Sequence, residues 1–419
     1  MSIAELYQLY TQNYLVDTDT RTIRQDTLFF ALKGANFNGN TFAEKALEVG
    51  ASYAVIDEAE YKTSDKTILV DDVLKTLQKL ANYHRNQLDI PFIGLTGSNG
   101  KTTTKELIHA VLKTQLKTSA TSGNFNNHIG VPLTLLAIQP DTEMAVVEMG
   151  ANHQKEIAFL SSICEADFGY ITNFGKAHLE GFGGVEGVIK GKSELYDFLR
   201  VNDKTAFVNP EDAIQVEKTK DIDSILFYEN MHFVSDQPFV NIQVDETLIQ
   251  SHLVGAYNYN NIAIAVTIGK HFGISLENIK LAIENYVPKN NRSEILKKGS
   301  NTIILDAYNA NPSSMEVALK SFAKAEGEHK VVILGDMFEL GEDSAKEHQA
   351  IADLTIALGF NQSYFIGEHF AQIKTSGQQF STFEDFAEFM KANTTLSDAS
   401  ILIKGSRGMK LERTLELLE

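Results

Sequence analysis

The chain alternates between short apolar runs and segments whose apolar residues recur every three or four positions. Runs such as 92–95 and 331–334 predict buried strands, because a strand covered on both faces has no solvated side. The segment 73–84 sets its leucines on one face and predicts a helix. The chain therefore mixes strands and helices along its length.

The predicted strands are 28–32, 52–56, 67–70, 92–95, 144–147, 169–171, 302–305, 331–334, 364–366 and 401–403. The predicted helices are 41–49, 73–84, 102–116, 258–271, 313–326, 343–358, 382–392 and 409–418. A polar stretch at 204–254 leans toward β structure. Regular alternation beyond 288 indicates a parallel sheet covered on both faces, so we expect the α/β class.

The length of 419 residues exceeds what one hydrophobic core usually supports. Domains commonly hold roughly 100–200 residues, so we expect more than one. Composition and pattern favour three, at 1–88, 89–288 and 289–419, with a linker near 288–291.

Composition narrows the class of protein. The chain is 43% hydrophobic and 22% charged, which is ordinary for a globular protein. Its net charge of −18 argues against a duplex-binding protein, which needs a basic face. Local lysines or arginines can still bind small anions, and the simplest meaning of the charge is solubility. We expect no nucleic-acid partner.

The compartment follows from what the sequence lacks. Cys164 is the only cysteine, which fits a reducing compartment. The N-terminus shows no secretory signal, and no apolar stretch approaches the roughly 20 residues that span a bilayer. We expect a cytoplasmic, monomeric protein with no membrane partner.

A glycine-rich loop between the strand 92–95 and the helix from 102 carries the clearest chemistry. Its residues are Gly97, Ser98, Asn99, Gly100, Lys101, Thr102 and Thr103. A loop in this position turns backbone N–H groups and the positive helix end toward an anion. Lys101 supplies charge for phosphates, and the Thr102 hydroxyl suits Mg²⁺. The loop predicts ATP binding.

The loop departs from the common formula G-x-x-x-x-G-K-[ST]. Leu95 stands where that formula has its first glycine, and the nearest glycines are Gly94 and Gly97. A chance glycine-rich turn is the alternative, which the strand–loop–helix context disfavours.

Two further side chains are candidates for the metal. Glu148 ends an apolar strand and His178 closely follows another, and such strand ends face the ligand crevice of a parallel sheet. A solvated glutamate and a structural histidine are the alternatives. Lys192 lies in a helix, and its spacing alone predicts a surface lysine.

Longer strings make the chain resemble the Mur ligase family, the ATP-dependent amide-forming enzymes of peptidoglycan precursor synthesis. They are TGSNGKTTT at 96–104, NFNNHIGVP at 124–132 and EMGANH at 148–153. In the last region, DAYNANP at 306–312, LGDMFELG at 334–341 and KGSR at 404–407 resemble the member that joins UDP-N-acetylmuramoyl-tripeptide to D-alanyl-D-alanine. The resemblance covers nearly the whole chain.

The resemblance implies a three-domain architecture and a reaction. A small N-terminal α/β domain would bind the UDP-sugar, a central P-loop-type parallel sheet would bind ATP, and a Rossmann-like C-terminal domain would complete the site. ATP would phosphorylate the peptide carboxylate, and the dipeptide amine would attack the acyl phosphate. Metal and lysine charge would offset the repulsion between the two anions.

The resemblance also implies roles for single residues. Lys101 would steady phosphates, while Thr102, Glu148 and His178 would hold Mg²⁺ directly or through water. Lys192 matches a lysine that many members carbamylate, which would let it help to hold metal. Lys101, Lys192 and His178 are therefore the expected catalytic residues.

Further residues match nucleotide-binding and substrate-binding positions. The nucleotide set adds Asn258, Asn261, Arg292 and Asp306. The substrate set is Thr20, Arg21, Asn126, Asn127, Tyr308, Asn309, Asn311, Lys404 and Arg407. Helix capping is the alternative for Asn258 and Asn261, and turn formation for the asparagines near 126 and 309. Tyr257 stands where the family motif usually has histidine.

Three alternatives remain open. A sibling that adds a diamino acid would carry an Asp-Asn-Pro-Arg motif, where this chain has YNANP at 308–312. A folylpolyglutamate synthetase would share the architecture but lack the strings of the last region. A nucleotide-binding regulator without chemistry would not need Lys101, Glu148 and His178 together.

Overall fold

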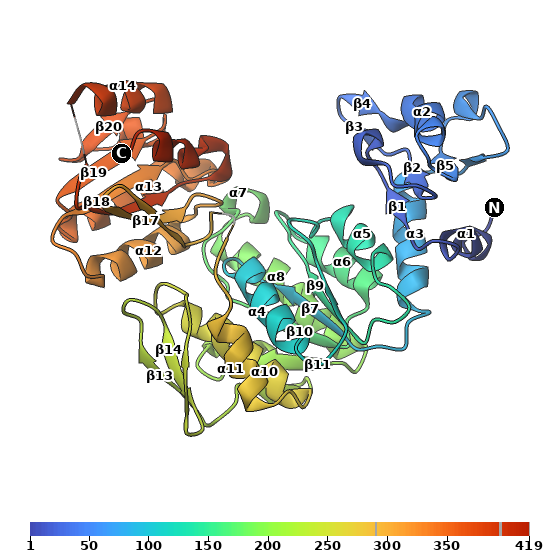
Figure 1. Ribbon diagram of the computed structural model, residues 1–419, viewed down its shortest axis with the longest axis horizontal. Coiled ribbons are helices and arrows are strands. Elements are labelled where there is room, and N and C mark those ends of the chain that lie inside the picture. Colours follow the sequence, from blue (N-terminus) through green and yellow to red (C-terminus); the bar gives the residue numbers. More distant parts are fainter. Residues whose placement is uncertain (290, 394–395, 419) are drawn as a thin grey trace.

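The computed structural model describes residues 1–289, 291–393 and 396–418, so Asn290 of the predicted linker lies outside the described residues. Figure 1 shows three bodies along the chain, coloured from blue through green and yellow to red. The predicted α/β class with three domains is confirmed. None of the helices in the described ranges is long and apolar enough to cross a membrane.

The first body is a parallel sheet in the order β1-β2-β5-β6. Its strands are β1 (Val16–Asp17), β2 (Leu28–Phe30), β5 (Tyr53–Ile56) and β6 (Thr67–Leu69). A hairpin of β3 (Lys33–Gly34) and β4 (Phe37–Asn38) and the helices α1 (Ile3–Tyr10), α2 (Ala43–Glu48) and α3 (Val73–Arg85) complete it. The first turn of the predicted helix 41–49 is part of a 3-10 helix, Gly39–Phe42.

Helix α3 joins the first body to the second, because it packs against α5 (Gly130–Leu136) and α6 (Glu156–Cys164) of the central body. Its polar side chains bond across the junction. The Gln78 amide donates to the His128 carbonyl at 2.9 Å, and the Arg85 guanidinium bonds the Asp167 carboxylate at 2.9 Å. The amphipathic pattern that predicted α3 thus reflects contacts with two bodies.

The central body holds six parallel strands in the order β12-β11-β10-β7-β9-β8. They are β7 (Phe92–Thr96), β8 (Thr118–Ala120), β9 (Met144–Glu148), β10 (Phe168–Ile171), β11 (Thr205–Val208) and β12 (Ser224–Leu226). Alternate residues face opposite cores: Phe92 and Val147 belong to one, and Ile93 and Val146 to the other. Both faces are therefore covered, as the apolar runs predicted.

Helices lie on both faces of this sheet. One core contains α4 (Lys101–Leu112), α10 (Asn258–His271) and α11 (Leu276–Glu284). The other contains α5 (Gly130–Leu136), α6 (Glu156–Cys164), α7 (Leu179–Phe182) and α8 (Val185–Val201). The polar stretch 204–254 also supplies α9 (Ala213–Lys218) and an antiparallel sheet of β13 (Met231–Ser235), β14 (Asn241–Val244) and β15 (Thr247–Gln250).

The C-terminal body has the strand order β16-β17-β21-β18-β19-β20. Its strands are β16 (Glu294–Lys298), β17 (Asn301–Asp306), β18 (Lys330–Gly335), β19 (Gln362–Ile366), β20 (Gln378–Phe380) and β21 (Ser400–Lys404). Its helices are α12 (Pro312–Lys324), α13 (Ser344–Ala357) and α14 (Phe383–Asn393). The four strands predicted here, β17, β18, β19 and β21, run parallel to one another as expected. The edge strand β16 was not predicted, and it runs antiparallel to β17.

The prediction of one helix at 409–418 is wrong. The chain forms two 3-10 helices, Arg407–Met409 and Leu411–Glu416, separated by Lys410. Lys410 has a positive φ of 51°, and a residue in this left-handed conformation interrupts a right-handed helix. Leu411 is nonetheless buried in the core, which explains the apolar spacing.

Candidate functional site

A cavity of about 1060 Å³ runs between the central and C-terminal bodies and reaches α3 of the first body at Gln78. It lies at the carboxyl ends of the central strands, where parallel sheets bind ligands. Most of the predicted site residues line it: Ser98, Asn99, Gly100, Lys101, Thr102, Thr103, Asn126, Asn127, Glu148, His178, Asn258, Asn261, Arg292, Asp306, Tyr308, Asn309 and Lys404.

The glycine-rich loop connects β7 to α4, as predicted. Gly97 and Gly100 have φ of 142° and 78°, a region that side chains disfavour. A Cβ at Gly97 would also collide with the Thr172 hydroxyl, so glycine is required there on two counts. The loop thus presents backbone at the N-terminus of α4, where an anion is stabilised.

Residues just after β10 hold this loop, and the sequence prediction did not include them. The Thr172 hydroxyl donates to the Asn99 carbonyl at 2.6 Å, and the Asn173 amide donates to the same oxygen at 2.9 Å. The Asn99 N–H in turn donates to the Asn173 side-chain oxygen at 3.2 Å. The signal available was the position of Thr172 and Asn173 at the end of a predicted strand.

The Lys101 side chain folds back over the glycine-rich loop. Its ammonium donates to the carbonyls of Gly97 at 2.7 Å and Ser98 at 3.2 Å. Burial lowers the pKa of Lys101, the Glu148 carboxylate opposes that shift, and the Arg292 charge adds to it. The cation therefore lies where a phosphate bound by the loop would meet it.

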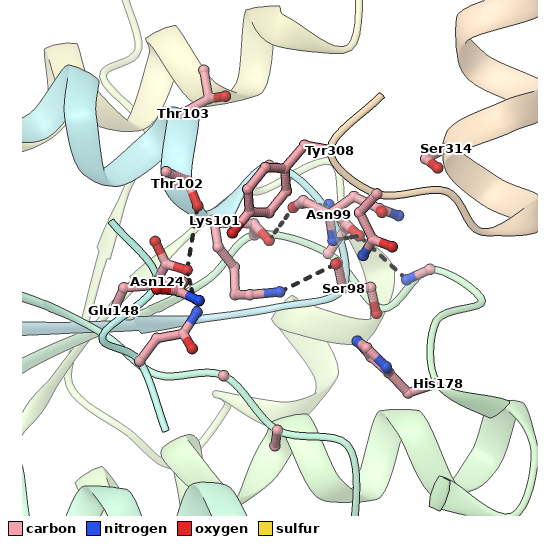
Figure 2. Close-up of a pocket in the computed structure, with 18 of the residues that line it drawn as sticks. Ser98, Asn99, Lys101, Thr102, Thr103, Asn124, Glu148, His178, Tyr308 and Ser314 are labelled. Carbon is pink, nitrogen blue, oxygen red and sulfur yellow. Dashed lines mark hydrogen bonds between the residues drawn. The ribbon is translucent and has the colours of Figure 1, made fainter. Parts of the chain in front are cut away.

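Thr102 and Glu148 form the pair expected to hold a metal. Figure 2 shows them pointing toward one another from α4 and β9, with Thr102 donating its hydroxyl to Glu148 Oε1 at 3.3 Å. The Asn126 amide donates to the same oxygen at 2.8 Å. Glu148 is only 1% exposed, and its Oε2 has no hydrogen-bond partner among the described residues.

An unpartnered buried carboxylate oxygen beside a hydroxyl fits a hard divalent cation, which takes oxygen ligands and few carboxylates. In the described ranges no three His, Cys, Asp or Glu side chains gather as a metal-binding group. Protein ligands here would thus be few, which suits Mg²⁺ bound together with phosphate oxygens.

His178 extends toward Ser98 from the segment after β10 (Figure 2). It lines the cavity, and its Nδ1 bonds the Glu339 carboxylate of the C-terminal body. This hydrogen bond lowers the pKa of Glu339. Glu339 was not among the predicted site residues, because only the folded chain brings these two segments together.

Lys192 corrects the expectation from its spacing. It is not a surface lysine: its side chain is 0% exposed and lies over the Phe182 ring, with the ammonium 4.8 Å from the ring centre. Its nitrogen donates to the Ala151 carbonyl at 3.0 Å, just behind the cavity wall. Burial, and then the charge of Lys101, holds the pKa of Lys192 well below its usual range.

Asn258 and Asn261 lie on the first turns of α10, against the glycine-rich loop. The Asn258 amide donates to the Val254 carbonyl at 2.8 Å, and the Asn261 amide donates to Asn258 Oδ1 at 2.7 Å. The Thr104 hydroxyl donates to Asn261 Oδ1 at 3.0 Å. Both asparagines therefore tie α10 to α4 while they line the cavity.

The C-terminal body contributes a charged wall. The Arg292 guanidinium lies 3.6 Å from the centre of the Tyr308 ring, a cation–π contact. The Lys404 ammonium pairs with the Asp306 carboxylate at 2.6 Å and donates to the Asn309 carbonyl at 3.2 Å. Asp306 and Lys404 end the adjacent strands β17 and β21, which explains why they meet.

The remaining predicted substrate residues fall in different places. The Asn127 side-chain oxygen accepts hydrogen bonds from the N–H groups of Ile129 at 3.1 Å and Gly130 at 2.8 Å, so it stabilises the turn that leads into α5. The Asn311 amide donates to Asn99 Oδ1 at 2.7 Å and joins the C-terminal body to the loop. Arg407 pairs with Glu412 at 3.3 Å and is exposed.

Thr20 and Arg21 lie in a 3-10 helix of the first body, outside the cavity. Arg21 is exposed and pairs with Asp19 at 2.5 Å. Gly97 and Lys192 also lie outside the cavity lining, directly behind it. The UDP-sugar role of Thr20 and Arg21 stays a prediction.

The cavity also includes residues that sequence reasoning missed. They come mainly from the segment after β9 and the start of α12: Asn124, Asn152, Gln154, Lys155, Glu156, Phe159, Ser313, Ser314 and Val317. The string at 148–153 signalled this segment, but its continuation into α6 carried no motif.

Replacing Lys404 by methionine is expected to lower the free energy of unfolding by about 3 kcal/mol, because the largely buried Asp306 carboxylate would lose its cation and keep only the Ser293 N–H as a partner. Chemical denaturation measures this change. Adding Asp306→Asn should recover part of the loss, whereas Lys297→Met, at an exposed position of β16, should have little effect. Equal losses for Lys404→Met and Lys297→Met would contradict the assignment.

Three family models match the chain. They are the Mur ligase family, catalytic domain at 13–85, the Mur ligase middle domain at 95–269 and the Mur ligase, glutamate ligase domain at 291–407. A curated relative from Bacillus subtilis (strain 168), UDP-N-acetylmuramoyl-tripeptide–D-alanyl-D-alanine ligase, is 35% identical over 96% of this chain and 92% of its own length.

Solved structures agree with the sequence matches. MurF from Acinetobacter baumannii superposes with a TM-score of 0.84 at 30% identity, covering 99% of this chain and 97% of that chain. The MurF ligase of Thermotoga maritima in complex with ADP gives a TM-score of 0.85 at 25% identity, covering 96% of both chains.

Proposed function

The chain belongs to the Mur ligase family, and from this premise we propose that it joins D-alanyl-D-alanine to UDP-N-acetylmuramoyl-tripeptide at the expense of ATP. The observation that carries the proposal is one cavity lined by a phosphate loop, by a buried carboxylate with one unpartnered oxygen, and by a charged wall from the C-terminal body. The product would be the UDP-muramoyl-pentapeptide of peptidoglycan synthesis. The relatives matched over nearly their full length carry this activity in their names, which favours it over the diamino-acid and folylpolyglutamate alternatives.

We assign the three domains separate parts of this task. Residues 1–88 would bind the UDP-sugar, 89–288 would bind ATP, and 289–419 would close the site over nucleotide and dipeptide. Because ATP and nucleotide-linked sugars are cytoplasmic metabolites, the reaction belongs in the cytoplasm. We propose that the protein acts as a monomer.

Activation of the carboxylate comes first. A carboxylate oxygen of the peptide attacks the γ-phosphorus of ATP, the bond from that phosphorus to the bridging oxygen breaks, and ADP leaves. The loop backbone and Lys101 hold the phosphates in place during this transfer. Thr102, Glu148 and His178 would hold Mg²⁺, which offsets the charge of the two anions when it is bound.

Amide formation follows. The D-alanyl-D-alanine amine attacks the acyl carbon, phosphate leaves with the former carboxylate oxygen, and the amine loses a proton. The Asp306–Lys404 pair and Tyr308 lie on the wall from which the dipeptide would approach. Closure of the bodies around the substrates would limit the access of water to the acyl phosphate.

Carbamylation of Lys192 belongs to the same proposal. Its lowered pKa favours the neutral amine, the form that adds CO₂, and the product would be an anion next to Ala151 in the cavity wall. The Ala151 carbonyl and the Phe182 ring fix the position of the amine. Such an anion would help to hold metal.

Lys192→Ala should lower ligase turnover by about 10- to 100-fold, since the metal would lose a supporting group. Acetate or propionate should restore part of the activity by filling the place of the carbamate. Lys190→Ala, at an exposed position of the same helix, should behave as the parent chain. Failure of every short carboxylate to restore activity would count against the carbamate.

The proposed function is tested by ADP release with each substrate omitted in turn. Release should require the UDP-muramoyl tripeptide and D-alanyl-D-alanine together, and assays with lysine and diaminopimelate tripeptides identify the preferred third residue. A free diamino acid or glutamate that replaces the dipeptide would instead favour one of the alternatives. ADP release that needs neither substrate would contradict the proposal.

A further inference from the structure

The contact between His178 and Glu339 joins two bodies of the protein. His178 follows β10 of the central body, and Glu339 lies in the segment between β18 and α13 of the C-terminal body. The Glu339 carboxylate bonds Nδ1 of the imidazole, and Glu180 N–H donates to the Glu339 carbonyl at 3.2 Å. Both the side chain and the backbone of Glu339 thus face the segment that carries His178.

The contact constrains which imidazole nitrogen can bind a metal. An ionised carboxylate only accepts hydrogen bonds, so Nδ1 is the donor to Glu339, and a metal would have to bind through Nε2 of the neutral ring. Histidines that bind metals commonly donate their other ring N–H to a carboxylate, which fixes the ring and raises its basicity. His178 lines the cavity that Thr102 and Glu148 also line.

We propose that Glu339 is a positioning residue, the carboxylate that orients His178 so that Nε2 faces the metal. The inference rests on the proposed metal-binding role of His178. It adds that the C-terminal body supplies part of the metal site without touching the metal.

Hydrogen bonds of the neighbouring residues fix the backbone from which the Glu339 side chain extends. The neighbouring N–H groups of Met337 and Phe338 donate to His348 Nε2 and Ser406 Oγ, each at 3.0 Å. Glu339 itself has a positive φ of 60°, which is uncommon for glutamate. Residues held in an uncommon backbone conformation by their neighbours are frequent at functional sites.

One consequence is a link between the bodies. Because Glu339 reaches His178 only while the C-terminal body is docked, the affinity of the site for metal depends on that docking. Asn311, which bonds Asn99 of the phosphate loop at 2.7 Å, and Lys176, which pairs with Glu347 at 2.7 Å, support the same arrangement.

The test uses Mn²⁺ and the full chain. Bound Mn²⁺ is measured by electron paramagnetic resonance, and spin-echo modulation from an imidazole nitrogen reports the histidine ligand. Glu339→Ala should weaken Mn²⁺ binding by about 10- to 100-fold and reduce the modulation. Glu339→Gln keeps an acceptor oxygen for Nδ1 and should retain part of the affinity. Glu342→Ala, at an exposed acidic residue of the same segment, is the matched control.

A cycle with His178→Ala separates positioning from a general structural role. In the His178→Ala background, Glu339→Ala should cause no further loss of Mn²⁺ affinity. An equal loss in both backgrounds, unchanged binding in Glu339→Ala, or no nitrogen modulation in the parent chain would overturn the inference. None of these results would bear on whether ADP release requires both substrates. Failure of this inference can therefore be told apart from failure of the proposed function.

Discussion

Replacing Lys101 by alanine is expected to lower kcat by about 10³-fold, the scale on which a lost charge-stabilising group reduces turnover. The Lys101 ammonium lies within the glycine-rich loop, 2.7 Å from the Gly97 carbonyl, whereas the other lysine of α4, Lys105, donates to the Thr121 carbonyl at 2.9 Å. The charge that develops on the transferred phosphoryl group would then have no cation from the loop. Steady-state ADP release at saturating substrates measures the effect.

Lys113→Ala is the control for Lys101→Ala. Lys113 is exposed at the C-terminal end of the same helix, so its loss removes the same charge without reaching the cavity. Its turnover should match that of the parent chain. Near-normal turnover of Lys101→Ala, in a variant whose unfolding temperature equals that of the parent chain, would contradict the phosphate-loop assignment.

Glu148→Gln should lower turnover by about 10²-fold and raise the Mg²⁺ concentration needed for half-maximal activity. Glutamine keeps the Oε1 that accepts from Thr102 at 3.3 Å and from Asn126 at 2.8 Å. The substitution removes only the negative charge and the unpartnered oxygen. Folding should therefore be preserved while metal binding is weakened.

Mg²⁺ titrations of activity and a thermal unfolding scan measure the two effects of Glu148→Gln. Glu143→Gln, at the exposed residue before β9, should change neither. If Glu148→Gln loses activity with an unchanged Mg²⁺ requirement, the carboxylate does not hold the metal.

Helices with apolar residues at every third or fourth position, and strands with continuous apolar runs, could be predicted from the sequence. The helix at 258–271 has the observed bounds of α10, and the run 92–95 lies within β7. The same patterns missed the 3-10 helices after Arg407, since a left-handed Lys410 leaves apolar spacing unchanged. They also missed strand β16, whose polar sequence carries no apolar run and which forms by pairing with the following strand β17.

Some residues of the candidate site could also be predicted from local sequence, and others could not. The phosphate loop and Glu148 are recognisable because each stands directly after a predicted strand, and adjacent strands then bring them together. Spacing alone put Lys192 on the surface, because it cannot show that Phe182 and Ala151 cover that face of α8. The pair of His178 and Glu339 depends on the docking of two bodies, so no local pattern contains it.

The most direct test of the central claim follows oxygen from the peptide carboxylate. The UDP-muramoyl tripeptide is labelled with ¹⁸O in its terminal carboxylate and incubated with ATP, Mg²⁺ and D-alanyl-D-alanine. Activation through an acyl phosphate predicts that each amide formed releases inorganic phosphate carrying one ¹⁸O atom. Pentapeptide formation with unlabelled phosphate would contradict the acyl phosphate, and ADP release without pentapeptide would contradict the ligase.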